Sequence, residues 1–117
     1  YANPEYRFNG VIEQNVNGKA EKNQIYFHES WTGTVNYLDV VQQDGTELYF
    51  VDSNNDLKIE SVRKKSDTID TKFVYPNSPL ITPDPYVVEN LKIGQEMFDN
   101  YLGLIKQMNS INPDANK

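Results

Sequence analysis

Cysteine is absent from the 117-residue sequence, and histidine occurs only once. Without cysteine the chain can form neither a disulfide nor a thiolate metal site, and one histidine argues against a zinc centre. The lack of cysteine is compatible with the cytosol and with the exterior of a cell. The sequence begins at Tyr1 rather than at methionine, so the chain is either processed or trimmed, and of the two compartments we favour the exterior.

Long apolar stretches are missing too, and the longest apolar run is far shorter than the ~20 residues of a membrane-spanning helix. Eleven basic and 17 acidic residues give a net charge of −6. This charge repels phosphate backbones and anionic lipid surfaces, so we expect neither a nucleic-acid partner nor a role at a membrane surface, and the short apolar runs exclude a membrane span. A protein or a carbohydrate partner is compatible with it, and the oligomeric state is open.

Apolar residues make up 38% of the sequence, and eight Tyr, five Phe and one Trp supply much of the surface that folding can bury. A chain of this length fits one hydrophobic core. We therefore expect a single globular domain over residues 1–109, followed by a flexible tail over 110–117.

Alternating apolar and polar residues predict about six short strands within residues 5–75. Turn residues separate these strands, most clearly Asn17-Gly18 and Asp44-Gly45. The first turn is expected to extend through Lys22-Asn23. The expected strands cover approximately 5–14, 24–29, 31–42, 46–52, 57–64 and 68–75. Consecutive hairpins of this kind predict an antiparallel β-meander, either a curved sheet or a small barrel-like roll.

Prolines interrupt the strand pattern and predict an extended connector over 76–85, because proline cannot donate a ladder hydrogen bond. Asp84 can cap a helix whose first position is Pro85. Apolar residues then recur at spacings of three and four, which predicts one amphipathic helix over 85–109. They are Val87, Leu91, Gly94, Phe98, Tyr101 or Leu102, Ile105 and Met108. Gly94 and Gly103 are expected to mark close approach to the sheet. Packing this helix on the meander gives an α+β fold.

An acidic turn over residues 52–60 is the sharpest local feature of the sequence. Asp52, Asn54 and Asp56 occupy alternating positions, Lys58 offers its backbone carbonyl, and Glu60 lies at position nine. Oxygen ligands at these spacings can wrap Ca²⁺, so we take the side chains of Asp52, Asn54, Asp56 and Glu60 as candidate metal ligands.

Two residues depart from the EF-hand pattern that this turn resembles. Leu57 stands where the sharp turn normally needs Gly, and Arg63 replaces the bidentate Glu at position twelve. The flanking segments are also strands, so only a strand-flanked calcium loop remains, with an expected Kd on the order of 10⁻⁴–10⁻³ M. The alternative is an ordinary hairpin turn, because Asn and Asp bond nearby backbone groups and tolerate left-handed φ.

Trp31, Tyr37 and Tyr49 are candidate partner-binding residues, because aromatic side chains exposed on a sheet can stack on sugars or anchor a protein. They can equally cover the second face of the sheet. His28 and Ser30 share one strand face, but no nucleophile-elbow glycine motif accompanies them. We expect no catalytic residues, no enzymatic activity and no cofactor other than Ca²⁺.

Three segments carry a resemblance to a known group of proteins. They are Phe8-Asn-Gly10-Val-Ile12, then Tyr49-Phe-Val-Asp52 with Asp56-Leu-Lys-Ile-Glu60-Ser-Val62, and finally Phe98-Asp-Asn-Tyr101-Leu102 with Ile105. In that order they resemble small uncharacterised proteins of reduced archaeal genomes. The resemblance implies strands followed by a helix as one unit, and it implies no activity and no site residues.

Three functions are compatible with these patterns. The first is a non-enzymatic binding or structural module that contacts a protein or a glycan. The second adds calcium as a clamp on the 52–60 hairpin of an extracellular β-domain. The third is a carrier of a small apolar ligand, with the meander curled around a pocket and the helix as a lid.

Overall fold

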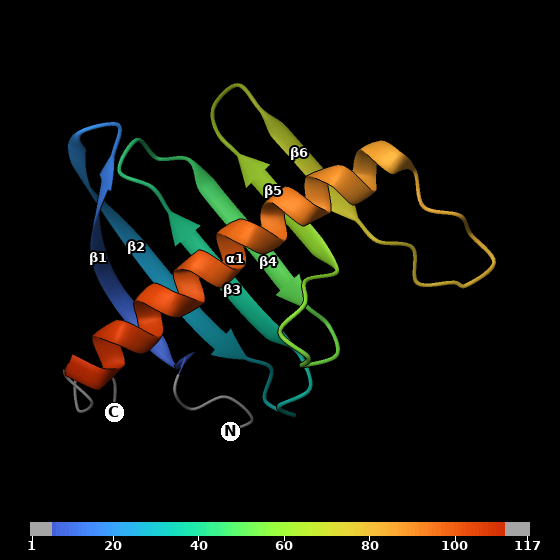
Figure 1. Cartoon of the computed structure of the whole chain (residues 1–117), viewed down its shortest axis with the longest axis horizontal. Helices are drawn as coiled ribbons and strands as arrows, with labels where there is room; N and C mark the ends of the chain where they lie inside the picture. The colour runs from blue at the N-terminus through green and yellow to red at the C-terminus, as the bar shows by residue number, and fades with distance from the viewer. Residues whose placement is uncertain (1–5, 112–117) are drawn as a thin grey trace.

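Six strands and one helix follow one another along the chain, as the alternation and the helical spacing predict (Figure 1). The computed structural model describes residues 6–111, apart from the side chain of Val16. The elements are β1 (Phe8–Val16), β2 (Lys19–Glu29), β3 (Asn36–Val41), β4 (Glu47–Asp52), β5 (Ser61–Lys65), β6 (Asp70–Val74) and α1 (Pro85–Ile111). Each strand pairs antiparallel with the next one. The predicted α+β fold, a meander followed by a helix, is confirmed.

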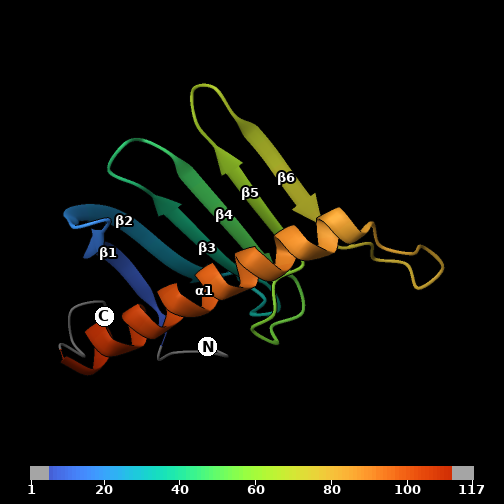
Figure 2. The same cartoon turned by 45° about the horizontal axis from the view of Figure 1, so that its top comes forward.

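The sheet is open and curved rather than closed into a roll (Figure 2). Its strand order is β1-β2-β3-β4-β5-β6, so β1 and β6 form the two edges. The helix runs diagonally across one face, from β6 at its N-terminal end to β1 at its C-terminal end (Figure 1). The molecule therefore has two layers, a sheet and a single helix.

The first hairpin is tighter than we expected. A two-residue turn, Asn17-Gly18, joins β1 to β2, and Val16 pairs with Lys19 across it. Both turn residues have positive φ, 52° and 80°, as a type I′ turn requires. Because this turn matches the twist of the strands, pairing continues directly beyond it, and the expected start of the second strand at residue 24 is wrong.

Two other strands begin later than expected, because the residues expected to open them form local turns instead. Residues 30–35 form a loop rather than the start of β3, and in it the Ser30 carbonyl accepts the Gly33 N–H at 2.8 Å. Residues 57–60 likewise belong to a loop before β5, where Leu57 takes a left-handed φ of 64°. A left-handed residue cannot continue a strand.

The helix begins where the sequence predicts. The Asp84 side chain accepts the Tyr86 N–H at 2.8 Å, and the Asp84 carbonyl accepts the Val88 N–H at 3.0 Å. Pro85 fills the first helical position. The helix continues through Ser110 and Ile111, which the sequence assigned to a tail, and residues 112–117 lie outside the described part of the chain, as do residues 1–5.

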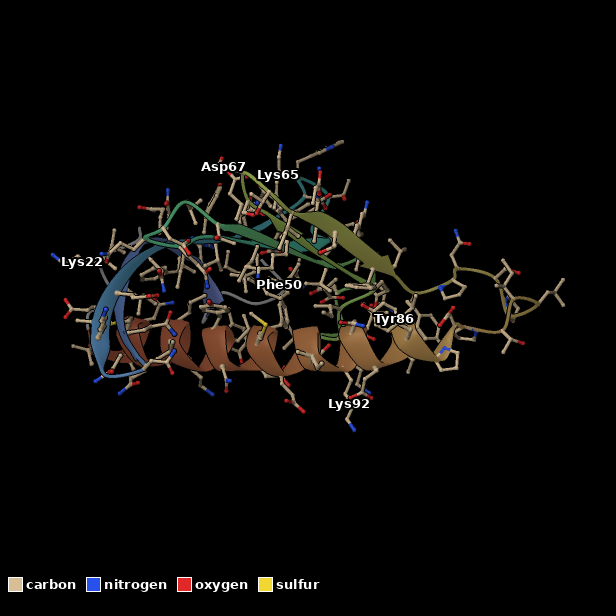
Figure 3. The ribbon with its side chains drawn as sticks, turned by 90° about the horizontal axis from the view of Figure 1, so that it is seen from above. Lys22, Phe50, Lys65, Asp67, Tyr86 and Lys92 are labelled. Carbon is tan, nitrogen blue, oxygen red and sulfur yellow. The ribbon has the colours of Figure 1, made fainter. Side chains whose placement is uncertain are left out.

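The core fills the space between the helix and the sheet. Three phenylalanines dominate it: the ring centroid of Phe98 lies 6.0 Å from that of Phe50 and 6.5 Å from that of Phe27. Figure 3 shows Phe50 between the two layers, whereas Lys92 points from the helix away from the sheet. The buried apolar residues are Phe8, Ile12, Ile25, Phe27, Leu38, Val40, Leu48, Phe50, Ile59, Leu91, Phe98, Tyr101, Leu102 and Ile105.

Only one of the two helical glycines marks a close approach. A Cβ atom on Gly94 would lie 3.1 Å from Val62 Cγ1 and 3.2 Å from Ile59 Cδ1, tighter than ordinary van der Waals contact. A Cβ atom on Gly103 would meet nothing within 4 Å. The expectation is therefore right for Gly94 and wrong for Gly103.

This difference predicts opposite behaviour in two matched substitutions. Gly103→Leu is expected to raise the free energy of unfolding by up to ~1 kcal/mol, because it gains helix propensity at an exposed position where the Cβ atom meets nothing. Gly94→Leu is expected to lower it by about 1–3 kcal/mol, because the added carbons must displace Val62 and Ile59. Urea denaturation followed by circular dichroism measures both, and equal effects of the two substitutions would contradict the close approach.

Candidate functional site

The acidic turn forms the β4–β5 loop, and Asp52 organises it from the last position of β4. The Asp52 side chain faces the core side of the sheet and is 0% exposed. Its Oδ2 atom accepts the Leu57 N–H at 2.8 Å and Asn36 Nδ2 at 3.1 Å, while Oδ1 accepts the Asp56 N–H at 3.3 Å. These bonds fold the loop around one carboxylate.

Leu57 adopts the backbone conformation that makes glycine the usual residue at position six of a calcium loop. Its φ is 64°, in the left-handed region that costs an L-residue about 1–2 kcal/mol. The bond from its N–H to Asp52 and the bond from Gln95 Nε2 to its carbonyl, at 3.0 Å, hold it there. Leu57 is therefore not the glycine that is usual at this position, but its backbone has the left-handed conformation for which glycine is normally needed.

The structure brings the predicted ligands together. Single carboxylate oxygens of Asp52, Asp56 and Glu60 all lie within 4.8 Å of one another. The Asn54 carboxamide lies beside them, and with its nitrogen turned inward it donates to Asp56 Oδ1 at 2.8 Å and to Asp52 Oδ1 at 3.0 Å. Glu60 Oε1 also accepts the Ser53 hydroxyl at 2.8 Å. The three carboxylates offer hard oxygen atoms that suit Ca²⁺, whereas Asn54 would have to turn its amide oxygen inward to bind the ion. Because Ca²⁺ takes about 6–8 oxygens, water would supply the remainder.

The sequence did not indicate the residues that anchor this loop from elsewhere in the chain. Asn36 of β3 is 0% exposed and donates to Asp52, and its Oδ1 atom has no hydrogen-bond partner in the described structure. Gln95 of α1 accepts the Ile59 N–H at 2.7 Å. Side chains of β3 and of the helix therefore anchor the β4–β5 loop by hydrogen bonds.

The three aromatic residues expected to bind a partner lie in different settings. Trp31 is 97% exposed in the β2–β3 loop. Tyr37 lies on the outer face of the sheet, opposite the helix, and is half-buried. Tyr49 shares that outer face, and its hydroxyl donates to Glu47, a bond that raises the pKa of the phenol.

Aromatic rings stack on one another on the outer face, which favours the interpretation that they cover the sheet over the interpretation that they bind a partner. His28 lies between Tyr26 and Tyr37, with centroid distances of 4.2 and 5.0 Å and interplanar angles of 17° and 21°. His28 Nε2 also lies 3.2 Å from Asp39 Oδ2. Both faces of the imidazole and one face of each tyrosine are therefore used within this row, whereas Trp31 and Tyr49 lie outside it.

A groove that the sequence did not indicate lies beside α1 on the helix-covered face of the sheet. Strands β4–β6 form its floor and the first half of the helix forms its wall. We call it the α1–β6 groove. Its lining residues are Gln42, Leu48, Val62, Lys64, Ile69, Thr71, Phe73, Tyr86, Asn90, Ile93, Gly94 and Met97. Its volume of about 450 Å³ is within the ~300–1,000 Å³ typical of small-molecule sites.

Two features of the chain create this groove. The helix crosses the strands diagonally, so the β5–β6 hairpin extends beyond it (Figure 2). Tyr86, Ile93 and Met97 form a second apolar stripe on α1, next to the buried one that contains Leu91 and Phe98. The excess apolar residues at 86, 93 and 97 are the signal by which the sequence could have indicated the groove.

Comparisons of the chain with protein-family models, with curated proteins and with solved structures find no match. The resemblance to archaeal proteins stays a prediction. Within residues 6–111, no helix is both long and apolar enough to cross a membrane.

Proposed function

We propose that the chain is a non-enzymatic binding domain that holds a small apolar ligand in the α1–β6 groove. The observation that supports this is an apolar hollow beside an otherwise filled core. Val62, Phe73 and Met97 are partly buried against that core, whereas Ile69 and Ile93 are 46% and 49% exposed. Apolar side chains gathered in a hollow gain free energy when a ligand removes them from water.

This proposal changes the ligand carrier that the sequence suggested. A pocket enclosed by a curled meander is wrong, because Phe27, Phe50 and Phe98 fill the space between helix and sheet and are each at most 1% exposed. The helix acts as one wall of an open groove rather than as a lid.

The size of the groove favours a small molecule over a protein. Twelve residues line it, whereas a stable protein interface involves about 20–30 residues on each side. A glycan is less favoured at the Tyr26-His28-Tyr37 row of the outer face, because these rings stack on one another.

Binding of a neutral apolar dye tests the proposal. Nile red is expected to bind the wild-type chain with enhanced fluorescence, and Ile93→Gln is expected to raise its Kd about five- to tenfold, because part of the apolar wall is lost. Ile81→Gln is the matched control: Ile81 lies in the connector, is 56% exposed and does not line the groove. Absence of binding, or equal weakening by both substitutions, would refute the proposal.

Calcium binding by the β4–β5 loop is a second candidate, supported by the three carboxylates whose oxygens lie within 4.8 Å of one another. The ion would neutralise their mutual repulsion and clamp the loop. With a Kd on the order of 10⁻⁴–10⁻³ M, 10 mM Ca²⁺ would stabilise the fold by about 1.4–2.7 kcal/mol. The midpoint of thermal unfolding, Tm, is then expected to rise by about 5 °C or more.

Glu60→Gln sharpens the calcium test, because its amide oxygen can still accept the Ser53 hydroxyl while one negative charge is lost. We expect this variant to keep the metal-free Tm and to lose most of the rise caused by Ca²⁺. If 10 mM Ca²⁺ leaves the wild-type Tm unchanged, the loop is an ordinary hairpin turn.

A further inference from the structure

The α1–β6 groove contains a single charged residue. Lys64 is the only one of its described lining residues with a charge, although acidic residues outnumber basic ones by 17 to 11 in the chain. The hollow on the other side of the helix, next to the acidic loop, is lined by charges of both signs, including Asp56, Asp99 and Lys92. The groove therefore has a mostly apolar lining whose one charge is positive, whereas the hollow carries charges of both signs.

The register of the strands places this cation at one side of the groove. Lys64 pairs with Leu48 on β4 and with Thr71 on β6. Val62 and Phe73 form the neighbouring row on the same face. One row thus offers an ammonium group and a hydroxyl, and the other is wholly apolar, so the floor of the groove is amphipathic.

Lys64 is also left without a close carboxylate. Within residues 6–111, close acid–base pairs join His28 to Asp39 and Arg63 to Asp70, and Lys64 takes part in neither. Asp44 feels Lys64 only weakly: the Thr46 N–H is the main reason that the pKa of Asp44 is lowered, and attraction to Lys64 is the smallest one. The ammonium group therefore remains available to an anion.

Arg63, on the opposite face of the sheet, shows the contrasting case. Its guanidinium donates twice to Asp70, at 2.8 and 2.7 Å. Arg63 is thus neutralised by a carboxylate of the chain itself, whereas Lys64 in the groove has no such partner within residues 6–111.

We infer that the ligand of the α1–β6 groove is a single-chain amphiphile with one anionic head group, such as an alkyl carboxylate. The carboxylate pairs with Lys64 and Thr71 can donate to it. The alkyl chain lies along Val62, Phe73, Ile93 and Met97, where it replaces water on both walls. This inference rests on the proposed function and adds the chemical class of the ligand.

Three probes with ten carbon atoms in the chain test the head group: decanoate, 1-decanol and decyltrimethylammonium. The two ionic probes are titrated below their micelle concentrations and 1-decanol below its solubility limit, in a calorimeter. Decanoate is expected to bind about five- to tenfold more tightly than 1-decanol, and decyltrimethylammonium is expected to bind most weakly. Lys64→Gln is expected to make the affinities for decanoate and 1-decanol equal.

Lys65→Gln is the matched control. Lys65 is the next residue along β5 and faces the outer side of the sheet (Figure 3). Its replacement by Gln changes the net charge by the same amount as Lys64→Gln. We expect it to keep the preference for decanoate. Equal weakening by both lysine substitutions would show a general charge effect and would overturn the inference.

Two further outcomes separate this inference from the proposed function. If wild-type protein binds all three probes equally and Ile93→Gln weakens each of them, the groove binds apolar chains and the anionic class is wrong. If no probe binds and size-exclusion chromatography shows a dimer that Ile93→Gln dissociates, a second copy of the chain covers the groove, and both the inference and the proposed function fail.

Discussion

Replacing Phe98 with alanine is expected to lower the free energy of unfolding by about 3–5 kcal/mol. The Phe98 side chain is 0% exposed and lies between Phe27 of β2 and Phe50 of β4. Its removal leaves a cavity where the helix meets the middle of the sheet, and neither layer can collapse into it without moving the other. Equilibrium unfolding in urea, followed by circular dichroism, measures the loss.

Met108→Ala on the same helix is the control for this substitution. Met108 is 38% exposed and lies outside the buried cluster, so its truncation is expected to cost less than ~1 kcal/mol. If Phe98→Ala cost no more than Met108→Ala, the helix would contribute little to the core, and the two-layer fold would be contradicted.

Most of the fold follows from short-range signals that act within a few residues. Asn17-Gly18 and Asp44-Gly45 impose turns that only one strand pairing satisfies, and alternation then decides which side chains face inward. Strand ends are less predictable. The segments 30–35 and 57–60 have strand-like composition, but hydrogen bonds to Ser30 and to Asp52 hold them as loops.

The acidic loop and the groove differ in how far the sequence predicts them. The four candidate metal ligands lie within nine consecutive residues, so a single hairpin brings them together and their spacing was informative. Asn36 and Gln95 reach the loop from β3 and α1, and no local pattern indicates such long-range contacts.

The α1–β6 groove depends on the angle at which the helix crosses the strands. Periodicity identifies an apolar stripe on a helix, but it does not fix that angle. Ile93 and Met97 broaden the stripe beyond what one sheet row needs, and the uncovered part of the sheet leaves them at the edge of the core. A wide apolar stripe on a single helix that is followed or preceded by a larger sheet is therefore a signal to test in other small α+β domains.

Asp52→Ala is expected to lower the free energy of unfolding by about 2–4 kcal/mol, even when EDTA removes all divalent metal. The substitution leaves the Leu57 N–H without its acceptor and removes one of the two acceptors of the Asn36 amide, which also donates to Asn55, and Asn36 is fully buried. Leu57 also loses the bond that holds its left-handed backbone. We therefore expect faster hydrogen exchange at the Leu57 amide.

The matched substitution is Asp56→Ala in the same loop. Asp56 is exposed, and its carboxylate accepts only the Lys58 N–H at 2.9 Å as a backbone bond, so its loss is expected to cost less than ~1 kcal/mol. Urea denaturation in EDTA compares the two variants. A cost for Asp52→Ala no larger than that for Asp56→Ala would mean that the loop does not depend on its buried carboxylate.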